Sequence, residues 1–296
     1  EIGMYTLFKT LMANNGKIPS HEMGKIPCLG YKDRDSKVKA NPIAFENELD
    51  KLGFPAWHLF KIEDYPTLPG SGGKFLPVIT SRGCPSQCTF CLSNSIHGRN
   101  VRTRSPEHVI EEIKWVTKDF DIQKVSILDN NFTFYKNHAL TFSELYIKNK
   151  IPLRFEVSQG VRLDRIDKDM IAALERAGCD LMGVGVESGS QETLNIVNKG
   201  TTLPMIEEKL KLIKENSNIE LTGFFILGFP HETEEMILET INFAVKLPLD
   251  YAAFTLFTPF PGTALFDQMI KENYFSLKSL NWEDLLLDKP TFKHRN

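Results

Sequence analysis

From Phe75 onward, short apolar runs rich in β-branched and aromatic residues alternate with longer segments whose apolar positions recur at helical spacing. The short runs predict strands near 77–81, 124–129, 154–158, 181–187, 221–227 and 251–257. This alternation is typical of a parallel sheet wound with helices, because parallel strands need a long crossover that is usually helical. Six units spaced roughly 27 to 47 residues apart favour a partial or full (βα) barrel over a flat doubly wound sheet.

The helical segments between these strands have identifiable ends. Ser105 precedes Pro106 and a run of apolar positions at helical spacing, which predicts a helix capped by the serine hydroxyl with proline at its first position. Asp167 is placed to cap a second helix, and Gly178 to end it. Further helices are expected over 202–216 and 232–247.

The first 73 residues lack this alternation. They are rich in Gly, Pro, Lys and Asp, and 54–73 combines aromatic residues with a Gly-Ser turn, so we expect an irregular connector. The predicted organisation is a connector over 1–73, a barrel over 74–263 and the start of a C-terminal segment over 264–296. Because the chain begins with Glu1 and no initiator methionine, we expect a fragment of a longer protein.

Composition narrows the class of protein. With 42% hydrophobic and 25% charged residues, 296 residues can bury a sizeable core. The net charge of -3 and the interspersed signs give no basic face, so neither nucleic acid nor an anionic membrane is expected as the main partner. No apolar run approaches the roughly 18 residues of a membrane span and no signal peptide is visible, so we expect a cytoplasmic protein. Five cysteines, an odd number, then favour metal binding or catalysis over disulfides.

Three of these cysteines lie within eight positions, in the loop after the first predicted strand. Cys84, Cys88 and Cys91 have the spacing Cys-x3-Cys-x2-Cys, which lets one tight loop surround a metal centre. The loop follows the carboxyl end of the strand, where barrels of this kind carry their chemistry. A structural zinc site or an electron-transfer cluster would usually have four protein ligands rather than three.

A fourth ligand has few sources in this chain. Cys179 immediately precedes the fourth strand, at the opposite end of the barrel, and is expected to be a buried structural residue. Cys28 lies in the connector, and His97 could complete a zinc site with three thiolates, so both alternatives stay open. Three thiolates alone leave one iron of a 4Fe-4S cluster without a protein ligand, and an open coordination position distinguishes a reactive metal site from a structural one.

An aromatic residue, Phe90, stands directly before the last cysteine. The motif Cys84-x3-Cys88-x-Phe90-Cys91 resembles the signature of the radical S-adenosylmethionine superfamily. The resemblance implies a partial, TIM-like (βα)6 barrel and a 4Fe-4S cluster whose open iron binds S-adenosylmethionine. It further implies cleavage of that cofactor to methionine and a 5'-deoxyadenosyl radical, which abstracts a hydrogen atom from a small-molecule substrate. The electron donor that it implies is a reduced flavodoxin or ferredoxin.

The fourth strand suggests where the rest of this cofactor binds. Reading the strand with period two places Gly183, Gly185 and Glu187 on one face. The glycines could leave room for an adenosyl group, and Glu187, with Ser188 beside it, could accept hydrogen bonds from ribose hydroxyls. The alternative is close packing between strand and helix, with a salt bridge at the rim. We favour ligand binding, because a carboxylate that ends an apolar strand needs a partner.

Other strand ends supply further candidates. Asp129 and Asn130 end the second strand, where the superfamily typically binds the methionine amino group, although turn-forming residues are also expected there. Arg162 follows the third strand and could pair with the methionine carboxylate or with a neighbouring acid. Phe90 is expected to lie against the adenine, because it belongs to the cysteine-bearing loop rather than to a strand.

Further segments indicate a branch of the superfamily. They lie at 80–91, 177–200, 223–233 and 258–263. Together they resemble cobalamin-associated proteins related to the anaerobic magnesium-protoporphyrin monomethyl ester oxidative cyclase. His231 stands where the pattern of that branch has glycine. In that branch a cobalamin-binding domain precedes the barrel. Its Asp-x-His-x2-Gly motif is absent from these 296 residues, so cobalamin is expected only through a preceding segment.

Two other classes of protein stay open. A methylthiotransferase-like radical enzyme would be expected to carry several cluster cysteines upstream, where this chain has Cys28 alone. A non-enzymatic zinc or iron-sulfur electron-transfer module would hold its metal with four ligands and would not bind S-adenosylmethionine.

Overall fold

A computed structural model describes residues 1–65, 73–278 and 280–295. The chain divides into two compact units, Glu1–Gly53 and Phe54–Asn296. The Gly-Ser turn expected at the end of the connector falls mostly on 66–72, outside the described residues.

The first unit consists of two helices, a hairpin and a short 3-10 turn. Its elements are α1 (Ile2–Ala13), α2 (Ser20–Met23), β1 (Gly30–Lys32), β2 (Val38–Ala40) and η1 (Leu49–Leu52). β1 and β2 pair antiparallel, and the Asp33 carboxylate closes their turn by accepting hydrogen bonds from the backbone N–H groups of Asp35 and Lys37, each at 3.0 Å. The sequence pattern predicts none of these elements, because the hairpin is short and polar and no residue of α1 is buried.

The second unit is built on a six-stranded parallel sheet with the order β10-β9-β8-β7-β6-β3. The strands are β3 (Phe75–Val78), β6 (Lys124–Ile127), β7 (Arg154–Val161), β8 (Cys179–Glu187), β9 (Glu220–Leu227) and β10 (Tyr251–Leu256). Each predicted strand overlaps one of these. Neighbours in the sheet follow the order of the sequence, so each crossover connects two adjacent parallel strands. The expected partial (βα)6 barrel is confirmed.

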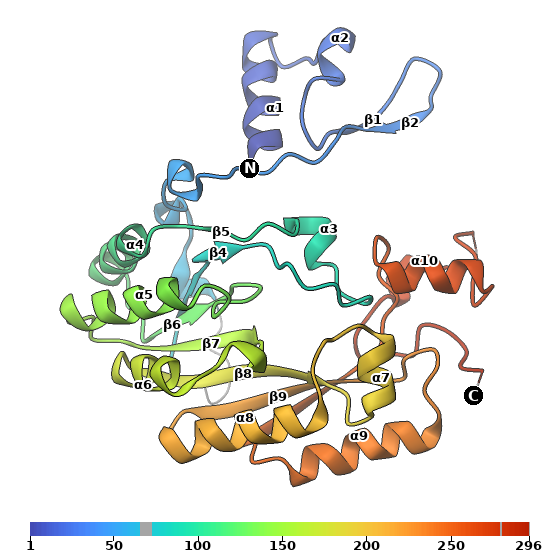
Figure 1. Cartoon of the computed structure of the whole chain (residues 1–296). Coiled ribbons are helices and arrows are strands. Elements are labelled where there is room, and N and C mark those ends of the chain that lie inside the picture. The colour runs from blue at the N-terminus through green and yellow to red at the C-terminus, as the bar shows by residue number, and fades with distance from the viewer. Residues whose placement is uncertain (66–72, 279, 296) are drawn as a thin grey trace. The chain divides into compact units, whose positions relative to one another are not determined.

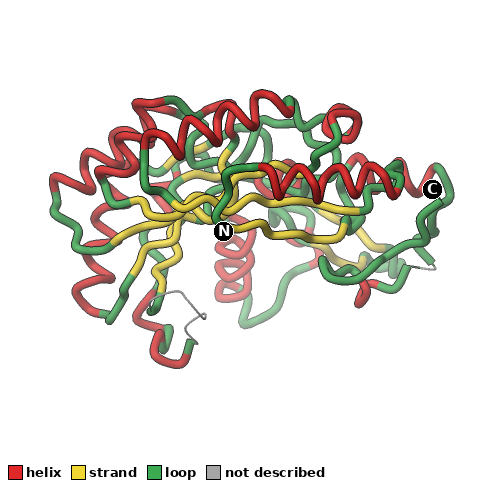
Figure 2. Tube along the Cα trace, turned by 90° about the horizontal axis from the view of Figure 1, so that it is seen from below, coloured by secondary structure: helices red, strands yellow, loops and turns green. Residues whose placement is uncertain are grey.

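Helices connect successive strands, and α4, α5, α6, α8 and α9 lie along one side of the sheet (Figures 1 and 2). The helices of this unit are α3 (Ser93–His97), α4 (Pro106–Asp119), α5 (Lys136–Lys148), α6 (Lys168–Arg176), α7 (Gln191–Ile196), α8 (Leu203–Asn216), α9 (Glu234–Lys246) and α10 (Ala264–Lys271). The Ser105 hydroxyl accepts the N–H of His108, and the Asp167 carboxylate accepts that of Met170, which confirms both predicted caps. Among the described residues, no helix combines the length and the apolar character that crossing a membrane would require.

The main core lies between the sheet and these helices. Val184 and Val186, on the face of β8 opposite Gly185 and Glu187, are fully buried. Cys179, the first residue of β8, is 1% exposed, which confirms that it is buried. Burying each large apolar side chain of this core contributes roughly 1.5–3 kcal/mol. A smaller apolar cluster contains Val197, Phe229, Phe257, Leu265 and Met269.

Candidate functional site

The three clustered cysteines lie in residues 83–101, a segment that we call the cysteine loop. Its base is closed by β4 (Ser81–Arg82), which pairs antiparallel with β5 (Arg102–Thr103). Gly83 begins the loop with a φ of +99°, and a Cβ there would collide with the carbonyl oxygen of Asn100. Only glycine fits this position, so the sharp turn before the first cysteine is specified by the sequence.

Backbone hydrogen bonds fasten the cysteine loop to segments that follow later strands. The Thr89 N–H donates to the carbonyl of Val197, just after α7, at 2.9 Å. The Thr89 carbonyl in turn accepts the N–H of Leu265, in α10, also at 2.9 Å. The loop that follows the first strand of the sheet is thereby tied to segments that follow β8 and β10.

A cavity of about 570 Å³ lies between the cysteine loop and the carboxyl ends of the strands. All three clustered cysteines line it, and the rest of its wall includes Asn130, Arg162, Glu187, Lys199, Phe224 and Ile226. Across the ranges 1–65, 73–278 and 280–295, no three His, Cys, Asp or Glu side chains converge on the position of a single metal ion.

Burial and neighbouring polar groups shift the pKa of the thiols in opposite directions. Burial raises the pKa of both Cys88 and Cys91. The nearby cations Lys199 and Arg162 oppose this effect at Cys88, and a hydrogen bond from the Ser93 N–H to sulfur opposes it at Cys91. Cationic and N–H groups of this kind favour the thiolate, which is the form that binds metal.

A buried ion pair in the cavity wall joins Glu187, at the end of β8, to Lys199. The Lys199 Nζ donates to the Glu187 Oε1 at 2.6 Å, and the two side chains are 8% and 12% exposed for Lys199 and Glu187. Burial alone would lower the pKa of Lys199, but the charges of Glu187 and Cys88 outweigh burial and raise that pKa. Glu187 has a φ of +69°, and the register of β8 against β9 shifts just before it. Such strain must be held by the surrounding structure and is frequent at functional sites.

The two glycines of β8 are both approached closely by other groups, although Gly185 lines the cavity. A Cβ at Gly183 would come within 2.6 Å of the Phe224 ring and 2.8 Å of a backbone oxygen. A Cβ at Gly185 would come within 2.7 Å of Glu187 and 2.8 Å of Lys199. A phenyl ring thus packs against Gly183, while Gly185 lies in the cavity wall beside an ion pair. The salt bridge of the alternative interpretation is present, but the close packing at Gly183 is against Phe224 of β9 rather than against a helix, and cofactor binding at Glu187 stays a prediction.

Arg162 reaches the same wall from the turn after β7. Its Nε donates to the Asp164 carboxylate at 3.0 Å, and its Nη1 donates to the carbonyl of Lys199 at 3.0 Å. The neighbouring acid considered as an alternative partner is therefore present. The guanidinium, whose side chain is 15% exposed, still lines the cavity.

Asn130 and Phe90 also line the cavity. The Asn130 side-chain oxygen accepts the N–H of Gly83 at 3.2 Å, at the start of the cysteine loop. The Phe90 ring packs edge-on against Phe229, with 5.6 Å between the ring centroids. Phe90 is thus anchored in the smaller apolar cluster while it forms part of the wall.

Asp129 and Ser188 lie outside the cavity wall. The Asp129 carboxylate is 2% exposed and accepts hydrogen bonds from Thr80 and Ser81. The Ser188 hydroxyl is fully buried and lies 3.0 Å from the hydroxyl of Thr240 on α9. Contact of these two residues with a cofactor stays a prediction, and both are engaged within the protein.

Lys199 is the site residue that sequence reasoning missed. It follows α7 and lies twelve positions after Glu187. The sequence feature that marks this position is the adjacent Gly200, which turns the chain after the helix with a φ of +71°. A lysine at such a turn is ordinarily assigned to solvent, so the pattern does not show that this one is directed inward.

The fold and the cavity define a class of protein: a partial parallel barrel with three thiols of one loop set over the carboxyl ends of its strands. Comparison with known proteins specifies the class further. The family model described as the radical SAM superfamily matches residues 78–244. An uncharacterised methyltransferase from Pyrococcus horikoshii is 32% identical over 272 residues, which are 92% of this chain and 58% of the relative. An anaerobic magnesium-protoporphyrin IX monomethyl ester cyclase from Rubrivivax gelatinosus is 29% identical over 81% of this chain and 43% of the relative.

Solved structures agree on the fold. The radical S-adenosylmethionine methyltransferase TsrM from Kitasatospora setae has a TM-score of 0.70 at 20% identity, over 92% of this chain and 53% of that one. The cobalamin-dependent S-adenosylmethionine radical enzyme OxsB has a TM-score of 0.66 at 22% identity, over 91% of this chain and 38% of that one.

The chain belongs to the radical S-adenosylmethionine superfamily, since the family model covers more than half of it. This confirms the resemblance carried by the cysteine motif. The 4Fe-4S cluster and S-adenosylmethionine are the cofactors of that family. The chain spans about half the length of the curated relatives that it matches.

Proposed function

We propose that this chain carries the catalytic barrel of an enzyme that uses a 4Fe-4S cluster to cleave S-adenosylmethionine to a 5'-deoxyadenosyl radical. The radical would act on a small-molecule substrate in a methylation, a cyclisation or a rearrangement. The observation that carries the proposal is that the three clustered cysteines line one cavity together with Arg162 and the Glu187–Lys199 pair.

The residues present fit such a cluster. Thiolates are the ligands that iron-sulfur clusters prefer, and the three cysteines face a cavity rather than packed core. When bound, the cluster supplies the electron that breaks the sulfonium bond of the cofactor. Cys84, Cys88 and Cys91 would hold one iron each and leave the fourth iron open.

The other wall residues are suited to the remaining parts of S-adenosylmethionine. Arg162 would pair with the methionine carboxylate, and the Asn130 side-chain oxygen would accept its amino group, since an amide oxygen can accept two hydrogen bonds. Glu187 would accept the ribose hydroxyls, because the bond from Lys199 occupies one lone pair of a carboxylate that has about four. Phe90 would pack against the adenine.

Lys199 has a different part in this proposal. Its ammonium neutralises Glu187 and lies near Cys88, so it lowers the cost of placing a carboxylate beside anionic thiolates. The pair keeps the Glu187 carboxylate in a fixed and largely buried position in the cavity wall. Orientation and exclusion of water are what the protein contributes when a cofactor performs the chemistry.

The names of the relatives narrow the reaction class of this chain, but they do not identify its substrate. Methyltransferases and a cyclase are among the curated relatives, which favours these two reaction types for this chain. TsrM has been solved with cobalamin bound and OxsB with aqua-cobalamin bound. We therefore extend the proposal to cobalamin, held by a segment of the full-length protein outside these 296 residues. Reduced flavodoxin or ferredoxin as the electron donor and a cytoplasmic location complete the proposal.

The test is anaerobic reconstitution with iron and sulfide, followed by electron paramagnetic resonance of the reduced protein with and without S-adenosylmethionine. We expect a 4Fe-4S signal that shifts when the cofactor is added and is absent when Cys84, Cys88 and Cys91 are all changed to alanine. Cys179→Ala is the matched control, because this cysteine lies at the other end of β8, and it should keep the signal.

Two outcomes would refute the proposal. Stoichiometric zinc without a cluster would identify a structural metal protein. A cluster signal that does not respond to S-adenosylmethionine would identify an electron-transfer module.

A further inference from the structure

We propose that Asp129 is a positioning residue that fixes the base of the cysteine loop, rather than a ligand of S-adenosylmethionine. The inference rests on the proposed function, because it assigns a purpose to the geometry of a loop that is to hold a cluster.

Every short contact of the Asp129 carboxylate is directed at the chain just before the cysteine loop. Oδ1 accepts the N–H of Thr80 at 2.6 Å, and Oδ2 accepts the hydroxyls of Thr80 at 2.6 Å and Ser81 at 2.7 Å. Burial raises the pKa of Asp129, while these hydrogen bonds act in the opposite direction. Three donors therefore stabilise a carboxylate that is 2% exposed and would otherwise be costly to bury.

The next residue continues this arrangement toward the cysteines. Asn130 accepts the N–H of Gly83, so Asp129 and Asn130 together hold Thr80, Ser81 and Gly83. Asn130 lines the cavity, whereas Asp129 does not. Of the two residues expected to reach the methionine amino group, the structure thus turns one toward the cavity and the other toward the loop base.

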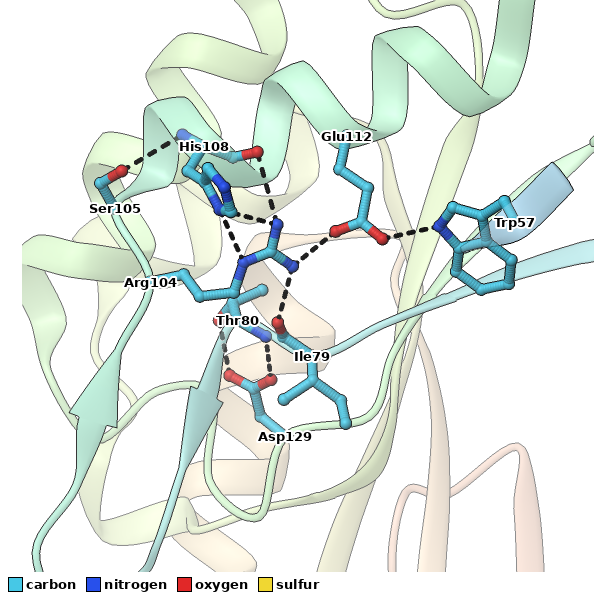
Figure 3. A network of polar contacts seen from close by, with 8 residues as sticks. All are labelled: Trp57, Ile79, Thr80, Arg104, Ser105, His108, Glu112 and Asp129. Carbon is cyan, nitrogen blue, oxygen red and sulfur yellow. Dashed lines mark hydrogen bonds and ion pairs between the residues drawn. The ribbon is translucent and has the colours of Figure 1, made fainter. Parts of the chain in front are cut away.

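The opposite strand of the loop base leads into Arg104, which binds residues just before the first strand and also reaches α4 (Figure 3). The Arg104 N–H donates to the Thr80 carbonyl at 2.8 Å, and its guanidinium donates to the carbonyl of Ile79 at 3.2 Å. The same guanidinium forms an ion pair with Glu112 on α4, and Glu112 accepts the indole N–H of Trp57 at 2.9 Å. The two ends of the cysteine loop are therefore held by the turn that follows β6 on one side and by α4 on the other.

Holding both ends limits the positions that the three thiols can take. A site works best when its ligands are held in place by a supporting layer of hydrogen bonds and packing, and a long loop supplies little of this by itself. Removing the Asp129 carboxylate leaves the donors of Thr80 and Ser81 without their acceptor. The loop base then opens more often, and Cys84, three residues after Ser81, becomes more accessible than in the wild type and poorly placed.

The first measurement uses the metal-free protein. The rate of alkylation of each cysteine is followed by mass spectrometry in the wild type, Asp129→Ala and Asp129→Asn. We expect Cys84 to react about tenfold faster in Asp129→Ala. Asp129→Asn should react at close to the wild-type rate, because the amide oxygen still accepts the Thr80 N–H and the two hydroxyls can turn to accept from the amide nitrogen.

Glu232→Ala is the matched control. The Glu232 carboxylate is also fully buried and accepts two backbone N–H groups and one hydroxyl, those of Gly228, Phe229 and Thr193. Its loss should leave the alkylation of Cys84 near the wild-type rate. An equal acceleration in Glu232→Ala and Asp129→Ala would show general destabilisation and overturn the proposal.

The second measurement is the electron paramagnetic resonance of the reconstituted proteins. We expect a distorted cluster signal and a weakened response to S-adenosylmethionine in Asp129→Ala, with both restored in Asp129→Asn. If Asp129→Asn loses the response while the alkylation of Cys84 stays normal, the carboxylate charge binds the cofactor and the proposal is wrong. Should Asp129→Ala fail to fold, Ser81→Ala removes one donor of the same contact and should accelerate alkylation less strongly; an unchanged rate in that variant overturns the proposal.

The two proposals fail in different ways. A wild-type protein that binds no cluster would refute the proposed function, while the alkylation rates of the metal-free variants would still decide the role of Asp129. A normal cluster together with equal alkylation in the wild type and Asp129→Ala would refute the positioning role alone.

Discussion

The substitution Glu112→Leu should destabilise the barrel strongly. Glu112 is 1% exposed on α4 and bridges the guanidinium of Arg104, which is 10% exposed, and the indole N–H of Trp57. Leucine leaves the buried guanidinium without its counter-charge, and breaking a buried ion pair from one side costs about 3–5 kcal/mol. Arg104 keeps its bonds to His108 and to the carbonyl of Ile79, so we expect the lower end, about 3 kcal/mol.

Thermal unfolding of the metal-free protein, followed by circular dichroism, measures this cost. One kcal/mol shifts the midpoint of a unit of this size by roughly 2–4 °C, so the expected decrease is about 6–12 °C. Glu215→Gln is the control, because the Lys211–Glu215 pair is 73% and 59% exposed and such pairs contribute at most about 1 kcal/mol.

A double substitution tests the cause of the decrease. If the cost comes from an uncompensated guanidinium, adding Arg104→Met to Glu112→Leu should recover part of the lost stability, since no buried charge is left unpaired. A double variant that unfolds at a lower temperature than Glu112→Leu would refute this reasoning. A single variant within about 2 °C of the wild type would show that the pair contributes little.

Two further predictions concern Gly83 and His231. Gly83→Ala should keep the fold but retain about half of the cluster iron or less, because the new Cβ collides with Asn100 and the φ of this residue is positive. The measurement is iron analysis of the reconstituted protein. Gly228→Ala is the control, because Gly228 also has a positive φ but has open space around it. Burial lowers the pKa of His231, so below about pH 6.5 the unfolded chain binds a proton more readily than the folded chain, and stability falls as the pH falls. His231→Gln should lessen this loss in urea unfolding at pH 7.5 and 5.5, and an identical loss in both proteins would contradict the assignment.

The strands, the helix ends and the position of the cysteine loop could be predicted because their signals are local. Ser105 caps its helix through an N–H three residues away, and Gly178 turns the chain directly after α6. Along β8, side chains point alternately to the two faces of the sheet, and this alternation does not depend on the rest of the chain. The first 53 residues gave no such signal, since a short polar hairpin and a helix without a buried face have no period to read.

Side-chain direction at the ends of strands was less predictable. The second strand ends at Ile127, so Asp129 and Asn130 lie in a turn, where the period-two rule no longer decides which of two neighbours faces the cavity. Gly183 shows a related limit. The missing side chain signals that something comes close, but only the pairing of β8 with β9 shows that this is the ring of Phe224.

The Glu187–Lys199 pair shows how far physical reasoning reaches without coordinates. A carboxylate at the end of an apolar strand needs a compensating partner, and this requirement correctly indicates that Glu187 is not an ordinary surface residue. It does not identify the partner, because many lysines and arginines in the sequence could satisfy the same charge. The partner is selected when α7 turns the chain back over the end of β8. Ligand binding and an internal salt bridge then cease to be alternatives, since a carboxylate held by one lysine retains the acceptor capacity that ribose hydroxyls would use.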